Sequence, residues 1–143
     1  MKLSGIIQNG VGRGQFFTSV AWVTRQCENM LGYIPFPGTL NIKILDRDIS
    51  KIELFFQGIS MKLIPDDPSF CSALIKEVTL FGIPAAVILP SEDVRIHKNH
   101  IFEIISPHSI KDSFGLKDGD MVTILTKQNE TKRKICHHVT PKR

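Results

Sequence analysis

Apolar residues along the first 125 positions fall into short runs, many alternating with polar residues and bounded by Gly, Pro, Asn or Asp. This pattern is typical of β-strands, in which successive side chains point to opposite faces. It predicts strands over residues 2–8, 39–44, 52–56, 59–63, 73–80, 83–89, 101–105 and 121–125. The strands at 52–56 and 59–63 flank Gln57-Gly58, so we expect them to pair as a hairpin.

Two segments have helical signals instead. Apolar residues recur at helical spacing over residues 19–31, and Gly32 is placed to end that helix. Ser106-Pro107 has the pattern of an N-cap followed by proline at the first helical position, which predicts a helix over residues 107–114. Gly115 is the expected end of this second helix.

The order of these elements predicts a mainly β fold. Regular crossover helices do not separate the strands, which argues against a doubly wound sheet. A small closed β-barrel with two short helices accounts best for the pattern. The 143 residues fit one domain. We place that domain at residues 1–125 and a C-terminal tail at residues 126–143.

The composition is that of an ordinary globular protein, with 42% hydrophobic and 22% charged residues. No apolar run approaches the roughly 20 residues that span a bilayer, and the N-terminus lacks the long apolar core of a signal peptide. We therefore expect a cytoplasmic protein with no membrane partner. Cys27, Cys71 and Cys136 are an odd and sparse set, which indicates reduced thiols.

The net charge of +4 is concentrated in the tail. Residues 126–143 hold six Lys or Arg residues against Glu130, a net charge of +5, which leaves −1 for residues 1–125. Because the body is not basic, a nucleic-acid partner is not expected. The tail is either solvated or in contact with an anionic partner.

The first candidate site is the segment Gly10-Val11-Gly12-Arg13-Gly14-Gln15, directly after the first predicted strand. Alternating glycines expose backbone N–H groups, and Arg13 adds a forked cationic donor, so the segment suits a phosphate group. It is not a P-loop, and its third glycine comes one residue too early for the dinucleotide fingerprint. The alternative interpretation is a flexible hairpin.

The second candidate lies at the start of the strand predicted over residues 39–44. Thr39 and Asn41 project from the same face of that strand and offer a hydroxyl and an amide oxygen. Both donors are neutral, so Mg²⁺ bound here would need substrate phosphates to complete its ligands. The alternative is a strand start with side-chain-to-backbone hydrogen bonds.

Glu103 stands out because it lies within the apolar run of residues 101–105. It either points outward from an alternating strand or is placed to bind or deprotonate a substrate. Two weaker candidates are Asp46 with Asp48, where a turn is the simpler interpretation, and Cys136-His137-His138, which lies in the basic tail without a partner cluster.

These stretches together resemble the CTP-dependent riboflavin kinases, a family best known from archaea. The matching motifs are 10–17 (GVGRGQFF), 31–41 (LGYIPFPGTLN), 103–107 (EIISP) and 116–120 (LKDGD), in an order and spacing that extend over about residues 3–125. The resemblance implies a cradle-loop β-barrel of the riboflavin-synthase-like type. It also implies transfer of the γ-phosphate of CTP to the 5′-hydroxyl of riboflavin, giving FMN and CDP.

The resemblance further implies a role for each candidate residue. Residues Gly10 through Gln15 and the turn His108-Ser109-Ile110-Lys111 would contact the nucleotide, and Thr39 and Asn41 would bind Mg²⁺. Glu103 would contact the flavin and, as the carboxylate of the matched set outside the turn at 118–120, would be the catalytic base. Arg95 takes the flavin-binding position at which the family tends to have threonine. The alternative function is a non-catalytic cradle-loop barrel that binds a ligand or DNA. Oligomeric state is not predicted.

Overall fold

The computed structural model describes residues 1–10, 17–69, 72–90 and 100–126. The strands among these residues are β1 (Lys2–Gln8), β2 (Leu40–Ile44), β3 (Lys62–Leu63), β4 (Ala73–Leu80), β5 (Ile83–Pro90), β6 (Ile101–Ile105) and β7 (Met121–Thr126). The helical elements are α2 (Ala21–Leu31), the 3₁₀ helix η1 (Asp46–Lys51), α3 (Ile52–Phe55) and α5 (Ile110–Phe114). The mainly β class is confirmed.

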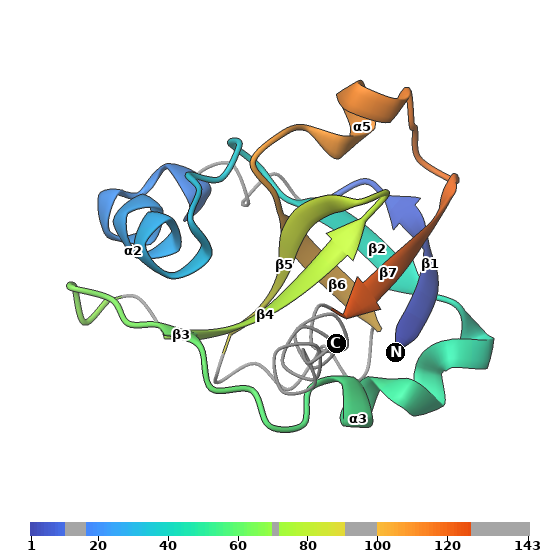
Figure 1. Cartoon of the computed structure of the whole chain (residues 1–143), viewed down its shortest axis with the longest axis horizontal. Helices are drawn as coiled ribbons and strands as arrows, with labels where there is room; N and C mark the ends of the chain where they lie inside the picture. Colours follow the sequence, from blue (N-terminus) through green and yellow to red (C-terminus); the bar gives the residue numbers. More distant parts are fainter. Residues whose placement is uncertain (11–16, 70–71, 91–99, 127–143) are drawn as a thin grey trace, which may run out of the picture.

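The strands form one antiparallel sheet that closes into a barrel (Figure 1). Their order is β3-β4-β5-β6-β2-β1-β7, and pairing between β4 and β7 closes a ring of six strands. The closing register pairs Val78 with Thr126 and Thr79 with Leu125. The short strand β3 adds to the outer edge of β4 and is not part of the ring. The prediction of a closed barrel is confirmed.

Alternation along the strands fills the inside of the barrel. Leu40, Ile42 and Ile44 of β2 are buried, and the side chains between them are more exposed. They pack with inward residues of the other strands, among them Leu3, Ile7, Val78, Val87, Phe102, Ile104, Val122 and Ile124. Burial of this apolar surface is the main stabilising contribution to the fold.

Helix α2 covers part of the outer face of the barrel (Figure 1). Its buried residues Trp22, Val23 and Cys27 pack against a second apolar cluster on the outward side of the sheet, which includes Ala73, Ile75, Ala86, Ile88 and Ile105. Strands β4 and β5 are therefore buried on both faces, which explains the nearly continuous apolar run in β5. As predicted, Gly32 ends the helix with a left-handed conformation at φ 86°.

The hairpin predicted over residues 52–63 is wrong. Ile52–Phe55 form helix α3, which continues from η1, and only Lys62–Leu63 of the second predicted strand pair with β4. Ile52 and Phe55 are buried three positions apart, which is helical spacing. The Phe55 ring lies 5.3 Å from that of Phe102 inside the barrel, so this helix packs against the barrel core.

The second predicted helix starts later than expected. Helix α5 spans Ile110–Phe114, and its N-cap is Ser109, whose hydroxyl accepts a hydrogen bond from the Asp112 N–H at 3.2 Å. Ser106 is not the cap, because its hydroxyl donates to the His108 carbonyl. Gly115 ends the helix as predicted. With α3 and η1 present, the barrel carries more helical elements than the two that were expected.

Candidate functional site

A row of polar side chains crosses three adjacent strands of the barrel. Asn41 of β2 pairs directly with Gln8 of β1 on one side and with Glu103 of β6 on the other. Directly opposed residues of antiparallel strands project from the same face. Because the neighbouring Leu40 and Ile42 point into the core, this row lies on the outer face. It ends at Ile88 of β5, which pairs with Glu103 and packs under α2.

Thr39 joins this row just before β2 begins. Its hydroxyl donates a hydrogen bond to the Glu103 carboxylate at 3.2 Å. Thr39 and Asn41 are half-buried and Glu103 is exposed. The structure therefore brings the Thr39 hydroxyl to the Glu103 carboxylate, 64 positions later in the sequence, and pairs the Asn41 residue with the same Glu103.

The first residue of the glycine segment lies against this group. A Cβ atom at Gly10 would collide with the Asn41 side-chain amide nitrogen. A side chain at position 10 would therefore push the end of the Asn41 side chain out of this place. The predicted phosphate-binding segment thus comes close to a predicted metal ligand where Gly10 meets Asn41.

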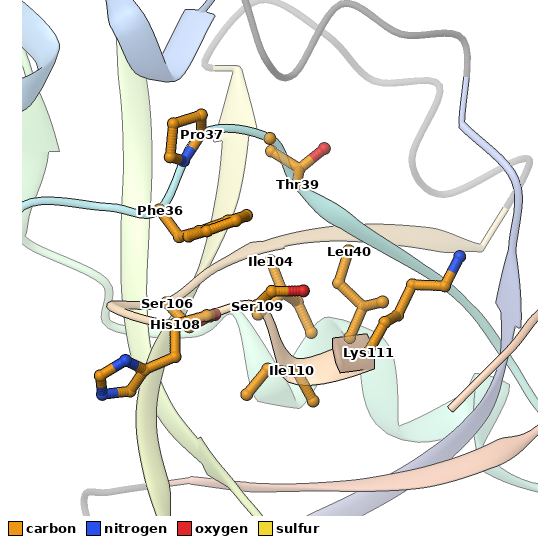
Figure 2. Close-up of a pocket in the computed structure, with 11 residues that line it drawn as sticks. Phe36, Pro37, Thr39, Leu40, Ile104, Ser106, His108, Ser109, Ile110 and Lys111 are labelled. Carbon is orange, nitrogen blue, oxygen red and sulfur yellow. The ribbon is translucent and has the colours of Figure 1, made fainter. Parts of the chain in front are cut away.

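A cavity of about 90 Å³ adjoins the same site. Figure 2 shows Phe36, Pro37 and Thr39 on one side of it and Ser109, Ile110 and Lys111 on the other. The first side is the turn that leads into β2, and the second is the start of α5. Thr39 lines the cavity and also bonds Glu103, so the cavity and the polar row meet at this residue.

Local hydrogen bonds hold the α5 side of the cavity. Ser109 caps the helix. The Lys111 ammonium forms an ion pair with Asp118 at 3.0 Å, and both side chains remain partly exposed. Asp120 accepts a hydrogen bond from the Lys117 N–H at 2.9 Å. The turn at 118–120 therefore supports Lys111 while leaving its cation accessible to an anionic ligand.

Of the weaker candidates, Asp48 has a structural role, Asp46 is exposed, and Cys136-His137-His138 lies outside the described residues. The Asp48 carboxylate is buried, accepts from the Ser4 N–H at 2.8 Å and pairs with Lys51 at 3.0 Å. These contacts lower its pKa below the usual range and leave it facing the protein. Burial raises the pKa of the Cys27 thiol to about 11, so it is protonated at neutral pH and a poor nucleophile.

The oxygen donors at this site could supply only part of the coordination shell of a Mg²⁺ ion. The Thr39 hydroxyl and Asn41 amide oxygen are hard neutral donors, and the Glu103 carboxylate lies beside them. Mg²⁺ prefers six oxygen ligands and keeps several waters or substrate phosphates. Across the described ranges, no cluster of three or more His, Cys, Asp or Glu residues could hold a metal by itself. The arrangement suits an ion that arrives with phosphate oxygens.

Some predicted site residues are not tested by the geometry. Val11 through Gln15 and Arg95 lie outside the described residues, as does Cys136-His137-His138. Gln8 and Phe36 are among the residues of the site that were not predicted. Gln8 is found only through its strand register with Asn41. Phe36 lines the cavity with 45% of its side chain exposed, and its place in the turn before Pro37 was the available signal.

No helix within the described ranges has the length and apolar character needed to cross a membrane.

Comparison with known proteins connects this site to a family. Residues 7–126 match the family model CTP-dep_RFKase, described as a domain of unknown function, DUF120. That range includes β2, β6 and α5, which carry Asn41, Glu103 and Lys111.

Curated relatives are riboflavin kinases of archaea. The chain is 32% identical over 133 residues to the riboflavin kinase of Saccharolobus solfataricus, which covers 87% of this chain and 73% of the relative. It is 34% identical to that of Pyrobaculum aerophilum, over 87% of this chain and 60% of the relative. Identity to the riboflavin kinase of Methanosarcina barkeri is 30%, over 92% of this chain and 59% of the relative. The chain therefore belongs to the CTP-dependent riboflavin kinase family, a family of kinase enzymes.

Proposed function

We propose that this protein is a CTP-dependent riboflavin kinase, which transfers the γ-phosphate of CTP to riboflavin and gives FMN and CDP. The single observation that carries the proposal is the meeting of Thr39, Asn41 and Glu103 on the outer face of the barrel. Family membership supplies the substrates, and the polar row supplies groups suited to phosphoryl transfer. CTP as the donor rests on the family alone.

The reaction needs positioning and charge neutralisation more than covalent chemistry. In the proposed step, the 5′-hydroxyl oxygen of riboflavin bonds to the γ-phosphorus of CTP. The bond from that phosphorus to its bridging oxygen breaks, and CDP leaves with the electron pair. The hydroxyl proton passes to the Glu103 carboxylate, which is exposed and beside Thr39.

Thr39 and Asn41 would hold Mg²⁺ together with nucleotide phosphates, and the ion would supply positive charge to the γ-phosphate. Gly10 through Gln15 would bind the phosphates through backbone N–H groups, with Arg13 adding a cation. His108 through Lys111, on the far side of the cavity, would contact the rest of the nucleotide. Arg95 and Glu103 would contact the flavin.

Formation of FMN under a panel of nucleotides tests the proposal. Purified protein is incubated with riboflavin, Mg²⁺ and one of CTP, UTP, GTP or ATP, and FMN is measured by chromatography with fluorescence detection. We expect CTP to support FMN formation far better than the others. Equal or better turnover with ATP would reject the donor assignment. No FMN with any nucleotide would favour the non-catalytic ligand-binding barrel.

A further inference from the structure

Thr18 is a buried polar residue that the proposed site does not yet include. Its side chain is 1% exposed, and its hydroxyl accepts a hydrogen bond from the Gly38 N–H at 2.8 Å. A buried hydroxyl requires such a partner, because its contact with water has been lost. Thr18 lies just after the glycine segment, and Gly38 is next to Thr39.

The stretch that donates this hydrogen bond turns sharply before β2. Gly38 has φ 110°, a conformation that favours glycine, and Pro37 has no N–H to donate. The Phe36 N–H is held by the Ser106 carbonyl at 2.8 Å, and the strand ladder begins at Leu40. Between these points, the bond from Gly38 to Thr18 fixes the turn that sets the position of Thr39.

Thr18 is itself held firmly against the barrel. The neighbouring Phe17 ring makes an edge contact with Trp22 at 6.2 Å, and the Phe17 carbonyl accepts from the Val20 N–H at 3.2 Å. Trp22 is buried in the cluster between α2 and the outer face of the sheet. A continuous set of contacts therefore runs from this packed helix through Thr18 to Gly38.

We infer that Thr18 is a positioning residue that fixes the place of Thr39 for the Mg²⁺-nucleotide complex, an inference that rests on the proposed function. Two residues that flank positions 11–16 approach the same short stretch: Gly10 lies against Asn41, and Thr18 accepts a hydrogen bond from the Gly38 N–H. In this role Thr18 does not itself bind a reacting group. It acts by fixing the turn that carries Thr39.

A kinetic experiment separates this role from general stability. Thr18→Val removes the hydroxyl and keeps the branched shape, and Thr18→Ser keeps the hydroxyl. We expect Thr18→Val to raise the Mg²⁺ concentration for half-maximal FMN formation about tenfold, since misplaced binding groups lose much of their effect. Thr18→Ser should restore the wild-type requirement.

The matched control is Thr123→Val. It makes the same chemical change at a hydroxyl that bonds Ser4 at 3.2 Å between β1 and β7. We expect it to leave the Mg²⁺ requirement unchanged. A folded Thr18→Val protein with the wild-type Mg²⁺ requirement would overturn the inference.

Hydrogen exchange of the Gly38 amide provides a readout that needs no catalysis. In the ligand-free wild-type protein this amide should be protected, and in Thr18→Val it should exchange on the order of tenfold faster. An unprotected Gly38 amide in the wild type would overturn the inference even where FMN is formed, and even if Thr18→Val failed to fold. A protected amide in a wild-type protein that forms no FMN would instead reject the proposed kinase function and leave the Thr18 contact in place.

Discussion

Asn41 and Glu103 are neighbours because of strand register. Their direct pairing between β2 and β6 puts both on the outer face, and Thr39 reaches the same carboxylate from two positions earlier. A slip of one residue in either strand would turn one of them into the apolar core. The chemistry of the site thus depends on apolar residues that fix the register, such as Leu40 and Ile104.

Asn41→Ala removes the amide that, on this account, binds Mg²⁺ directly. Loss of one preorganised contact to the developing phosphoryl charge should lower kcat on the order of 10²-fold. Thr39→Val should also impair turnover. Lys43→Ala, two positions along the same strand and exposed, is the matched control and should remain active. Steady-state FMN formation measures the effect, and thermal unfolding should change little. Wild-type turnover in a folded Asn41→Ala protein would remove Asn41 from the metal site.

Gly10→Ala tests the close contact between Gly10 and Asn41. The added methyl group would meet the Asn41 amide nitrogen and displace it, so we expect the loss of kcat to approach that of Asn41→Ala. In the double variant the methyl group has no amide to displace. The two effects should therefore be strongly non-additive in a double-mutant cycle. Fully additive losses would show that Gly10 acts without Asn41.

At the scale of elements, a buried carboxylate helps to hold the connection after β2 against β1. Asp48 of η1 accepts from the Ser4 N–H of β1 and pairs with Lys51. The Ser4 hydrogen bond is the largest cause that lowers the Asp48 pKa, and the Lys51 contact adds to it. The folded state therefore binds a proton at Asp48 less readily than the unfolded state does.

This lowered pKa predicts a pH dependence of stability. The contribution of Asp48 is complete above its unfolded pKa of about 4 and is lost as the pH falls through its lower folded pKa. Asp48→Asn should lower the free energy of unfolding at pH 7 by about 1–3 kcal/mol and flatten its decline below about pH 4. Urea denaturation from pH 3 to 7 measures both, with the exposed Asp46→Asn as control. An unchanged acid profile in Asp48→Asn would contradict this account.

The elements that sequence patterns predicted well are those with local signals. Short apolar runs, alternating or continuous, located β1, β2, β4, β5, β6 and β7, and helical spacing with Gly32 located α2. The strand predicted over residues 52–56 was wrong because Ile52, Leu54 and Phe56 alternate as in a strand. In the structure, the buried residues are Ile52 and Phe55, which lie on one face of a helix. The preceding η1 depends on the contact of Asp48 with Ser4, which no local pattern reveals. For α5, the spacing of Ser109 and Asp112 was a capping signal that could have been used.

The candidate site was predictable to the extent that its residues lie in recognisable motifs. Thr39, Asn41 and Glu103 were predicted, and the structure brings them together. Gln8 and Thr18 were not, because their roles arise from strand register and from a hydrogen bond between distant segments.

At the scale of the whole molecule, the last strand of the barrel, β7, ends at Thr126. Its N–H donates to the Met1 carbonyl, and it pairs with Val78 of β4. Deletion of residues 127–143 should therefore leave the unfolding temperature and FMN formation unchanged, because the strand ladders of the ring are kept. Thermal unfolding and turnover of the truncated chain test this. A truncated protein that fails to fold would show that the tail contributes to the core.

In the proposed reaction, this barrel catalyses transfer of the γ-phosphate of CTP to riboflavin. A single-turnover experiment with CTP labelled at the γ-phosphate, excess enzyme, riboflavin and Mg²⁺ tests it most directly, because it follows the transferred group itself. We predict that the label appears in FMN in step with CDP formation, and that Asn41→Ala slows this transfer. Label that remains in CTP, or appears only in inorganic phosphate while riboflavin is unchanged, would contradict the account.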